Sequence, residues 1–234
     1  MENVHAERSA GWSVLCYVAV LVVATMLNNG LPPVDEKATN TALLIDSHRF
    51  ALLFSAWLTF PAVAFFLWFL VGLRSYLSHA PGRQEGLPTL ALMAGVLMTA
   101  LSLFAVSLET VALYVSPDTF SKNGLEAIYN TFIFTQGGLG YAPVAIFLFA
   151  CALSMRRHES APSWLAALGY LAALGAAVAT LSIFFTSTDS FMAPGQLGPG
   201  IFGAIPAAIW LVATGVTLIQ SKRGVALSST SAAS

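Results

Sequence analysis

Residues 89–115 read TLALMAGVLMTALSLFAVSLETVALYV, and this stretch decides the class of the fold. It is long enough to cross a bilayer, since about 20 residues of helix span the hydrocarbon core. Its one charged residue is Glu109, which lies about 9 Å before the end of the stretch at 1.5 Å per residue. A carboxylate in hydrocarbon is costly, so we expect another part of the chain to receive it.

The composition indicates a membrane protein. Hydrophobic residues make up 57% of the 234 residues and charged residues 9%, whereas soluble domains carry about 25% charged residues. The apolar residues also occur in continuous runs rather than on alternating faces, which is typical of membrane spans. With a net charge of −1, nothing favours nucleic acid as a partner. We expect membrane lipid around the protein instead.

Six apolar runs predict an all-α, polytopic bundle of six transmembrane helices. Helices are expected because lipid offers the backbone no hydrogen bonds, and the strands of a membrane barrel would alternate. We expect one transmembrane domain over 1–223 and a disordered cytoplasmic tail at 224–234. The connection after the first helix contains TALLID at 41–46, which we expect to form a short interfacial turn. The helices are predicted at 12–29, 50–73, 89–115, 127–155, 164–185 and 201–220.

The basic residues predict that both termini lie in the cytoplasm. Cytoplasmic loops are enriched in Lys and Arg, and seven of the ten basic residues lie in the terminal segments and the second and fourth connections. The seven are Arg8, Arg74, Arg83, Arg156, Arg157, Lys222 and Arg223, against Lys37, Arg49 and Lys122 in the other loops.

With this orientation, polar side chains gather in the outer half of the bundle. Glu109 lies in the third helix, His48 and Arg49 precede the second, and Asn130 and Gln136 belong to the fourth. We predict that Arg49 receives Glu109, because a long side chain can reach inward from the interface. Asn130 and Gln136 are alternative hydrogen-bond partners for a neutral Glu109. The cluster is either a structural network that ties helices together or an outward-facing pocket.

Small residues predict where helices bend or approach closely. GGLGYAP at 137–143 lacks the spacing of a phosphate loop and predicts a kink or close-packing site. Small residues at four-residue spacing predict that the fifth and sixth helices pack against each other. These residues are Gly169, Ala173 and Ala177 on the fifth helix, and Gly200, Ala204 and Ala208 on the sixth.

No motif predicts catalysis, a cofactor or a metal site. His158-Glu159 begins like a zinc-protease motif, but Pro162 stands where the second His is required. Cys16 and Cys151 lie in apolar runs without a nearby Cys or His, so we interpret both as buried hydrophobic residues. We therefore expect a protein that is not an enzyme and that carries no cofactor and no metal.

Several short motifs resemble those of one known family. They are Arg49-Phe50 at the start of the second helix, Glu109, Arg156-Arg157, Pro162-Ser163-Trp164-Leu165, and Ile209-Trp210-Leu211 with Gly215. In these motifs the chain resembles the bacterial six-helix integral membrane proteins known only as a domain of unknown function. The resemblance implies six helices and a location in the bacterial plasma (inner) membrane, and it implies no activity.

Three functions are compatible with the sequence. The first, which we expect because catalytic motifs are absent, is a non-enzymatic membrane module, such as an accessory protein that binds a protein partner, and the other two are alternatives to it. The second is a carrier or receptor for a small apolar or amphipathic ligand, with an outward-facing pocket around Glu109. The third is a membrane enzyme that acts on a lipid. A water-reachable cavity of a few hundred cubic ångströms at Glu109 would favour the second function, and a sealed carboxylate with one cationic partner would favour the first.

Overall fold

The structure, a computed structural model, describes most of the chain. The described residues are 2–28, 38–78, 86–114, 122–157, 161–185 and 190–220. Every regular element in these stretches is a helix, as the apolar runs predict. The tail predicted at 224–234 lies outside the described residues.

Six segments of the described chain are long and apolar enough to cross a membrane. The first three lie in α1 (Glu2–Leu27), α2 (Ala38–Ser78) and α3 (Gly86–Tyr114). The fourth contains α4 (Lys122–Phe134), the π-helix η1 (Thr135–Leu139) and α5 (Tyr141–Arg157). The fifth contains α6 (Ser163–Thr180) and the 3-10 helix η2 (Leu181–Phe184). The sixth contains α7 (Leu197–Pro199), the π-helix η3 (Gly200–Ala204) and α8 (Ile205–Gln220).

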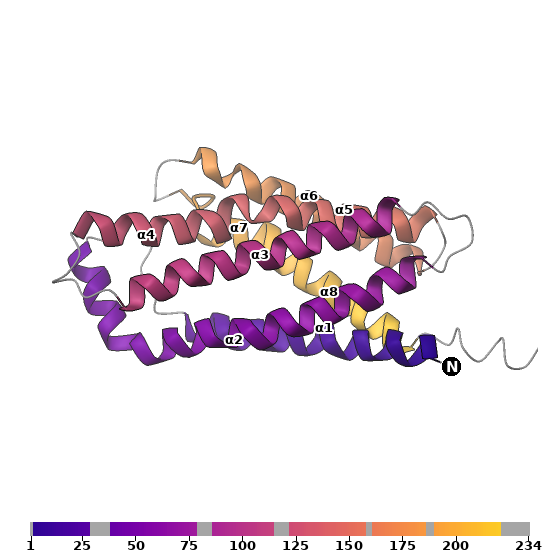
Figure 1. Cartoon of the computed structure of the whole chain (residues 1–234). Coiled ribbons are helices and arrows are strands. Elements are labelled where there is room, and N and C mark those ends of the chain that lie inside the picture. The colour runs from indigo at the N-terminus through magenta and orange to yellow at the C-terminus, as the bar shows by residue number, and fades with distance from the viewer. Residues whose placement is uncertain are drawn as a thin grey trace, which may run out of the picture.

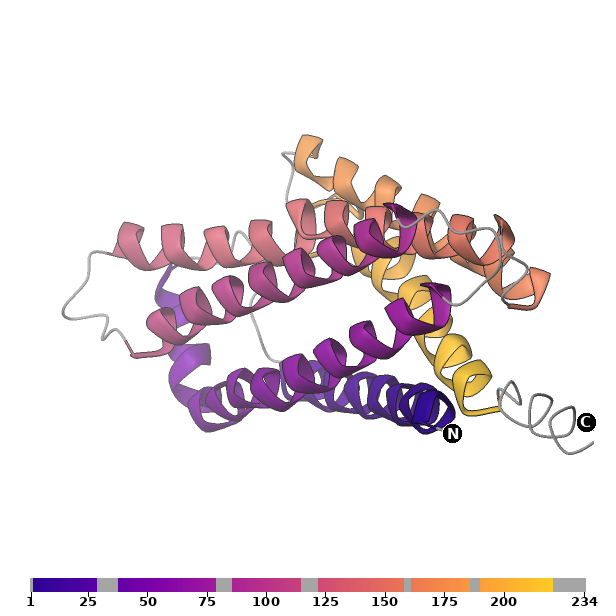
Figure 2. The same ribbon diagram turned by 45° about the vertical axis from the view of Figure 1, so that its right-hand side comes forward.

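These segments pack in chain order around a closed ring. α1 contacts α2, α2 contacts α3, α3 contacts α5, α5 contacts α6, and α6 contacts α8. Contacts between α8 and α1 close the ring. Figures 1 and 2 show α1 and α2 along one side of the bundle and α5 and α6 along the other. The N-terminal end of α1 and the C-terminal end of α8 lie at the same end of the bundle, as six crossings require (Figure 2).

One large cluster of buried apolar residues joins all six segments at the centre of the ring, and α3 contributes Ala91 and Ala94 to it. The Phe147 ring lies between two others: its centroid is 6.0 Å from that of Phe66 and 5.9 Å from that of Trp210. Trp210 is fully buried, and its indole N–H donates to the carbonyl of Leu165 at 3.2 Å. This hydrogen bond satisfies the polar atom of the largest side chain in the core.

The outside of the bundle is covered with large apolar side chains. Exposed examples from five of the segments are Trp12, Trp57, Phe60, Trp68, Phe104, Phe149, Leu171 and Leu174. Soluble monomers seldom expose apolar surface of this extent. Together with the six apolar helices, this surface identifies a multi-pass membrane protein.

Two helices begin ten or more residues earlier than the sequence predicts. α1 begins at Glu2 rather than at residue 12, and α2 begins at Ala38 rather than at residue 50. The interfacial turn predicted for TALLID at 41–46 is therefore wrong, because these residues belong to α2. The 23 residues before Pro61 contain neither Gly nor Pro, so no helix breaker separates the polar start of α2 from its apolar part.

The fourth and sixth segments are each interrupted by a π-helical turn. In η1, a Cβ atom on Gly140 would lie 2.5 Å from the carbonyl oxygen of Thr135, so the turn requires a glycine there. Gly138 faces η2, where an added Cβ would lie 3.0 Å from Ile183. The kink or close-packing site predicted for GGLGYAP is confirmed.

The predicted contact between the fifth and sixth segments is confirmed, but two of the residues predicted for it, Ala177 and Ala204, are wrong because both are exposed. α6 packs against both η3 and α8, and Gly169 and Ala173 are buried. On the sixth segment Gly203 lies against Tyr141 and against Ala179 of α6. The wider π-helical turn of η3 shifts the inward face by one position, so a four-residue spacing no longer follows it.

The interpretation of the two cysteines is confirmed for Cys151 and wrong for Cys16. Cys151 is fully buried in the central cluster. Cys16 is exposed, because α1 turns Ala10 and Val14 toward the core and places Cys16 on its outer face.

Candidate functional site

Glu109 lies in the buried stripe of α3. Ala105 and Leu113 lie four residues to either side of it, and both are buried. Glu109 itself is 4% exposed, and its Oε1 atom has no hydrogen-bond partner. An ionised carboxylate held in this way is costly unless a proton, a cation or a hydrogen-bond donor compensates the charge.

The neighbour of Glu109 across the helix interface is Tyr129 of α4. α3 packs against α4, and Tyr129, Phe132 and Ile133 form a buried cluster with Ala105. Leu108, which precedes Glu109 in the chain, also packs against this cluster. The carboxyl group therefore meets a mainly apolar surface with one hydroxyl group near it.

Arg49 has a different partner from the one predicted. Its Nη2 atom donates to the carbonyl oxygen of Leu113 at 2.6 Å. Leu113 lies in the last turn of α3, whose carbonyl groups lack partners within the helix. Among the described residues no ion pair joins Arg49 to Glu109. Arg49 thus caps the end of the helix that carries Glu109.

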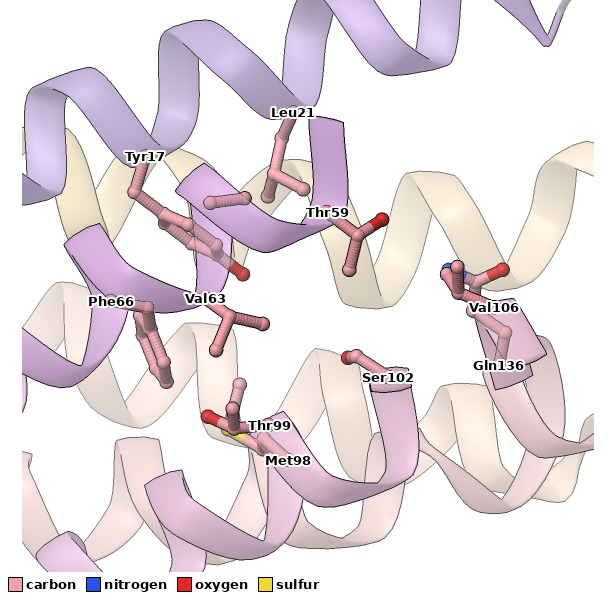
Figure 3. A pocket seen from close by; sticks show the side chains of 11 residues that line it. Tyr17, Leu21, Thr59, Val63, Phe66, Met98, Thr99, Ser102, Val106 and Gln136 are labelled. Carbon is pink, nitrogen blue, oxygen red and sulfur yellow. The ribbon is translucent and has the colours of Figure 1, made fainter. Parts of the chain in front are cut away.

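A small cavity lies between α1, α2, α3 and η1 (Figure 3). Its volume is about 70 Å³, which is room for several water molecules. Side chains from α1 and α2 face those of α3 across it (Figure 3). Its polar lining residues are Tyr17, Thr59, Thr99, Ser102 and Gln136. These hydroxyl and amide groups can supply the hydrogen bonds that bound water or a small ion requires.

Glu109 lies on the same helix face as this cavity, one layer further out. Ser102 lines the cavity, and Glu109 follows it by seven residues, or two turns of α3. The facing segment has the matching pattern: Gln136 lines the cavity and Tyr129 precedes it by seven residues. Ala105 of α3 and Phe132 and Ile133 of α4, which form a buried cluster with Tyr129, lie between the two levels. One apolar layer therefore separates the carboxyl group from the polar cavity.

The other predicted site residues are placed as follows. Gln136 lines the cavity from η1. Asn130 is half-buried on α4, next to Tyr129 in the chain. His48 is exposed at the start of the second span, and its Nδ1 atom lies 2.9 Å from the hydroxyl oxygen of Ser47. Of the five predicted residues, Gln136 lines the cavity. Glu109 lies on the cavity-facing side of α3 but does not line the cavity.

Sequence reasoning missed a second buried carboxylate, Glu7 of α1. It is 7% exposed, and its Oε2 atom has no hydrogen-bond partner. Ala10 and Val14 follow Glu7 by three and seven residues, and both are fully buried. This spacing was visible in the sequence, but Glu7 lies outside the apolar run predicted at 12–29. The cavity residues Tyr17, Thr59, Thr99 and Ser102 were also missed, because isolated hydroxyl groups are common in membrane helices.

The chain matches no protein family model, no curated protein and no solved structure. Within the described part of the chain, no group of three His, Cys, Asp or Glu residues could hold a metal ion. The function must therefore be inferred from the geometry of the site itself.

Proposed function

We propose that this protein is a non-enzymatic membrane carrier or receptor in which Glu109 binds a proton or another small cation. The observation that carries the proposal is the Oε1 atom of Glu109, which is buried without a hydrogen-bond partner. Ionisable groups within membrane helices commonly belong to proton relays or ion pathways. A carboxyl group placed in this way can exchange a proton or a cation with the polar cavity when the apolar layer between them rearranges.

The size of the cavity limits the ligand. Sites for drug-sized molecules have volumes of about 300–1,000 Å³, whereas this cavity has about 70 Å³. A proton, a water molecule or a small ion fits that volume, and an amphipathic ligand does not. The proposal therefore takes up the alternative of a carrier or receptor and replaces its apolar or amphipathic ligand with a proton or a small cation.

The competing function is a structural module in which Glu109 only ties helices together. In the simplest form of that function, the carboxylate would have a cationic partner among its neighbours. The sequence predicted Arg49 as this partner, but its guanidinium donates a hydrogen bond to the carbonyl oxygen of Leu113. This arrangement favours the binding function over the structural one.

We further propose the bacterial plasma membrane as the location, with both termini in the cytoplasm. The location rests on the resemblance to the bacterial six-helix family, and the orientation rests on the distribution of Lys and Arg. Ser190 and Ser163 lie at opposite ends of the fifth segment and its connection. In a background without Cys16 and Cys151, Ser190→Cys should react with an impermeant thiol reagent in intact cells, and Ser163→Cys should not. The reverse labelling pattern would invert the orientation.

Infrared spectroscopy of the purified protein tests the role of Glu109. We expect a C=O stretching band of a protonated carboxylic acid that is absent in Glu109→Gln. The matched control is Glu7→Gln, which removes the second carboxyl group that is buried in the described part of the chain and should leave this band in place. Both variants are nearly isosteric with the wild type, so their helices should pack in the same way.

Thermal unfolding of the same variants separates the two functions. A binding role predicts that Glu109→Gln changes the free energy of unfolding by less than about 1 kcal/mol, because the amide resembles the neutral acid. A structural ion pair predicts a loss of about 3–5 kcal/mol, because removing one charge leaves its partner buried. A large loss together with an unchanged infrared spectrum would contradict the proposed function.

A further inference from the structure

An open groove lies between the end of α5 and the beginning of α6, away from the Glu109 site. Its volume is about 830 Å³. Met155 and Ala166 form a buried apolar floor, and Trp164 is 55% exposed at its edge. The end of α5 and the start of α6, which line the groove, lie at the same end of the bundle as the start of α1 (Figure 1). The groove is therefore at the end that is rich in basic residues.

Positive charge is concentrated at the rim of the groove. Arg156 lines the groove and is exposed, and Arg157 follows it in the last turn of α5. α6 begins at Ser163, and no side chain caps its N-terminus. The first backbone N–H groups of a helix carry a partial positive charge and favour anions. None of the described lining residues is acidic. The rim thus combines a guanidinium group with an uncapped helix N-terminus.

The groove also continues along α6 toward the middle of the membrane. Tyr170 lines its far end and follows Ser163 by seven residues, which is about 10 Å along the helix. The Tyr170 ring packs against Phe149 of α5, with their centroids 5.8 Å apart. Ala167 lies between the rim and Tyr170 and presents no bulky side chain. The groove therefore has a cationic end at the interface and an apolar end in the hydrocarbon.

We propose that this groove binds an anionic phospholipid, with the phosphate at Arg156 and the start of α6 and an acyl chain along Ala167 toward Tyr170. Basic pockets between transmembrane helices at the cytoplasmic side are suited to anionic headgroups. Trp164 lies at the headgroup level, where Trp is enriched in membrane proteins. An anionic phospholipid has both a headgroup of net negative charge and an acyl chain. A free anion has no acyl chain, and the zwitterionic headgroup of phosphatidylcholine has no net charge.

Native mass spectrometry of the full-length, delipidated protein tests this proposal. The probes are phosphatidylglycerol, phosphatidylcholine and inorganic phosphate, each added to the protein in detergent. We expect phosphatidylglycerol to bind, and phosphatidylcholine and inorganic phosphate to bind at least fivefold more weakly. Arg156→Gln should weaken phosphatidylglycerol binding about fivefold, since one basic residue near a membrane surface contributes about that factor.

Two further variants make the result independent of any single substitution. Arg74→Gln removes an exposed arginine of α2 at the same end of the bundle, and it should leave lipid binding unchanged. Ala167→Trp fills the groove without removing charge, and it should also weaken phosphatidylglycerol binding. Equal losses in Arg156→Gln and Arg74→Gln would overturn the proposal in favour of general surface attraction. Unchanged binding in both Arg156→Gln and Ala167→Trp, or equal binding of phosphate alone, would also overturn it.

Discussion

The half of this bundle near the described ends of α1 and α8 and the opposite end are packed in different ways. In the half near these ends, a single large cluster of buried apolar residues connects all six segments, with Phe69, Phe147 and Trp210 fully buried in it. At the opposite end, the buried residues form two small clusters, one around Tyr129 and one of Leu52 and Leu113. Glu109 lies on α3 between these two clusters.

The comparison shows where the protein is rigid and where it can change. A fully packed cluster resists rearrangement, because every shift in it loses contacts on several sides. Regions with few buried apolar contacts open at lower free energy, and binding sites are drawn from them. The π-helical turn η1, which ends beside the polar cavity, belongs to the less densely packed end. We infer that motion needed at Glu109 occurs around η1 and α4 rather than in the central cluster.

The largest effect on stability is expected in the large buried cluster around Trp210. Trp210→Ala should lower the free energy of unfolding by about 3–5 kcal/mol, because it leaves a cavity and removes the hydrogen bond to Leu165. The matched control is Trp164→Ala, at a side chain that is 55% exposed, which should cost less than about 1 kcal/mol. Denaturation in detergent measures both. Equal losses would show that the central cluster does not dominate stability.

An intermediate effect is expected at the π-helical turn. Gly140→Ala should cost about 1–3 kcal/mol, because the new Cβ meets the carbonyl oxygen of Thr135 at 2.5 Å. Gly200→Ala is the control in the other π-helix, where an added Cβ has no neighbour within 4 Å. It should be neutral or slightly stabilising. If the two variants lose the same stability, the π-helical turn η1 is not held by Gly140.

The smallest effect is expected where Arg49 meets α3. Arg49→Met should cost about 1 kcal/mol, because it removes one hydrogen bond to the carbonyl of Leu113 from an exposed side chain. A double-mutant cycle with Glu109→Gln sharpens the comparison. The two changes should add to within about 0.5 kcal/mol if the side chains do not pair. A coupling free energy above about 1 kcal/mol would instead support the ion pair predicted from the sequence.

Several features of the fold could be predicted from residue patterns. The six apolar runs predicted six spanning helices, and GGLGYAP predicted the interruption of the fourth. The bounds of α1 and α2 could not be predicted as well, because their first turns are polar and were assigned to connections. Hydrophobicity identifies the part of a helix inside lipid, but it does not predict the helical turns that project beyond the lipid.

The candidate site could be predicted less completely than the fold. The sequence identified Glu109 because an ionisable residue inside an apolar run is rare and can be recognised without knowing its partner. The partner was predicted from depth alone, and depth does not specify which face of α2 turns toward α3. The structure therefore assigns Arg49 to Leu113, one turn beyond Glu109.

The sequence by itself determined that this is a helical, multi-pass membrane protein with one carboxyl group in the last part of its third span. Those properties follow from composition and from the length of the apolar runs, which are local quantities. Only the tertiary structure decided that α1 and α8 close the ring and that Glu7 is buried. It also decided that Gln136 shares a cavity with Tyr17. These properties depend on how helix faces from distant parts of the chain rotate against each other, and no local pattern encodes that rotation.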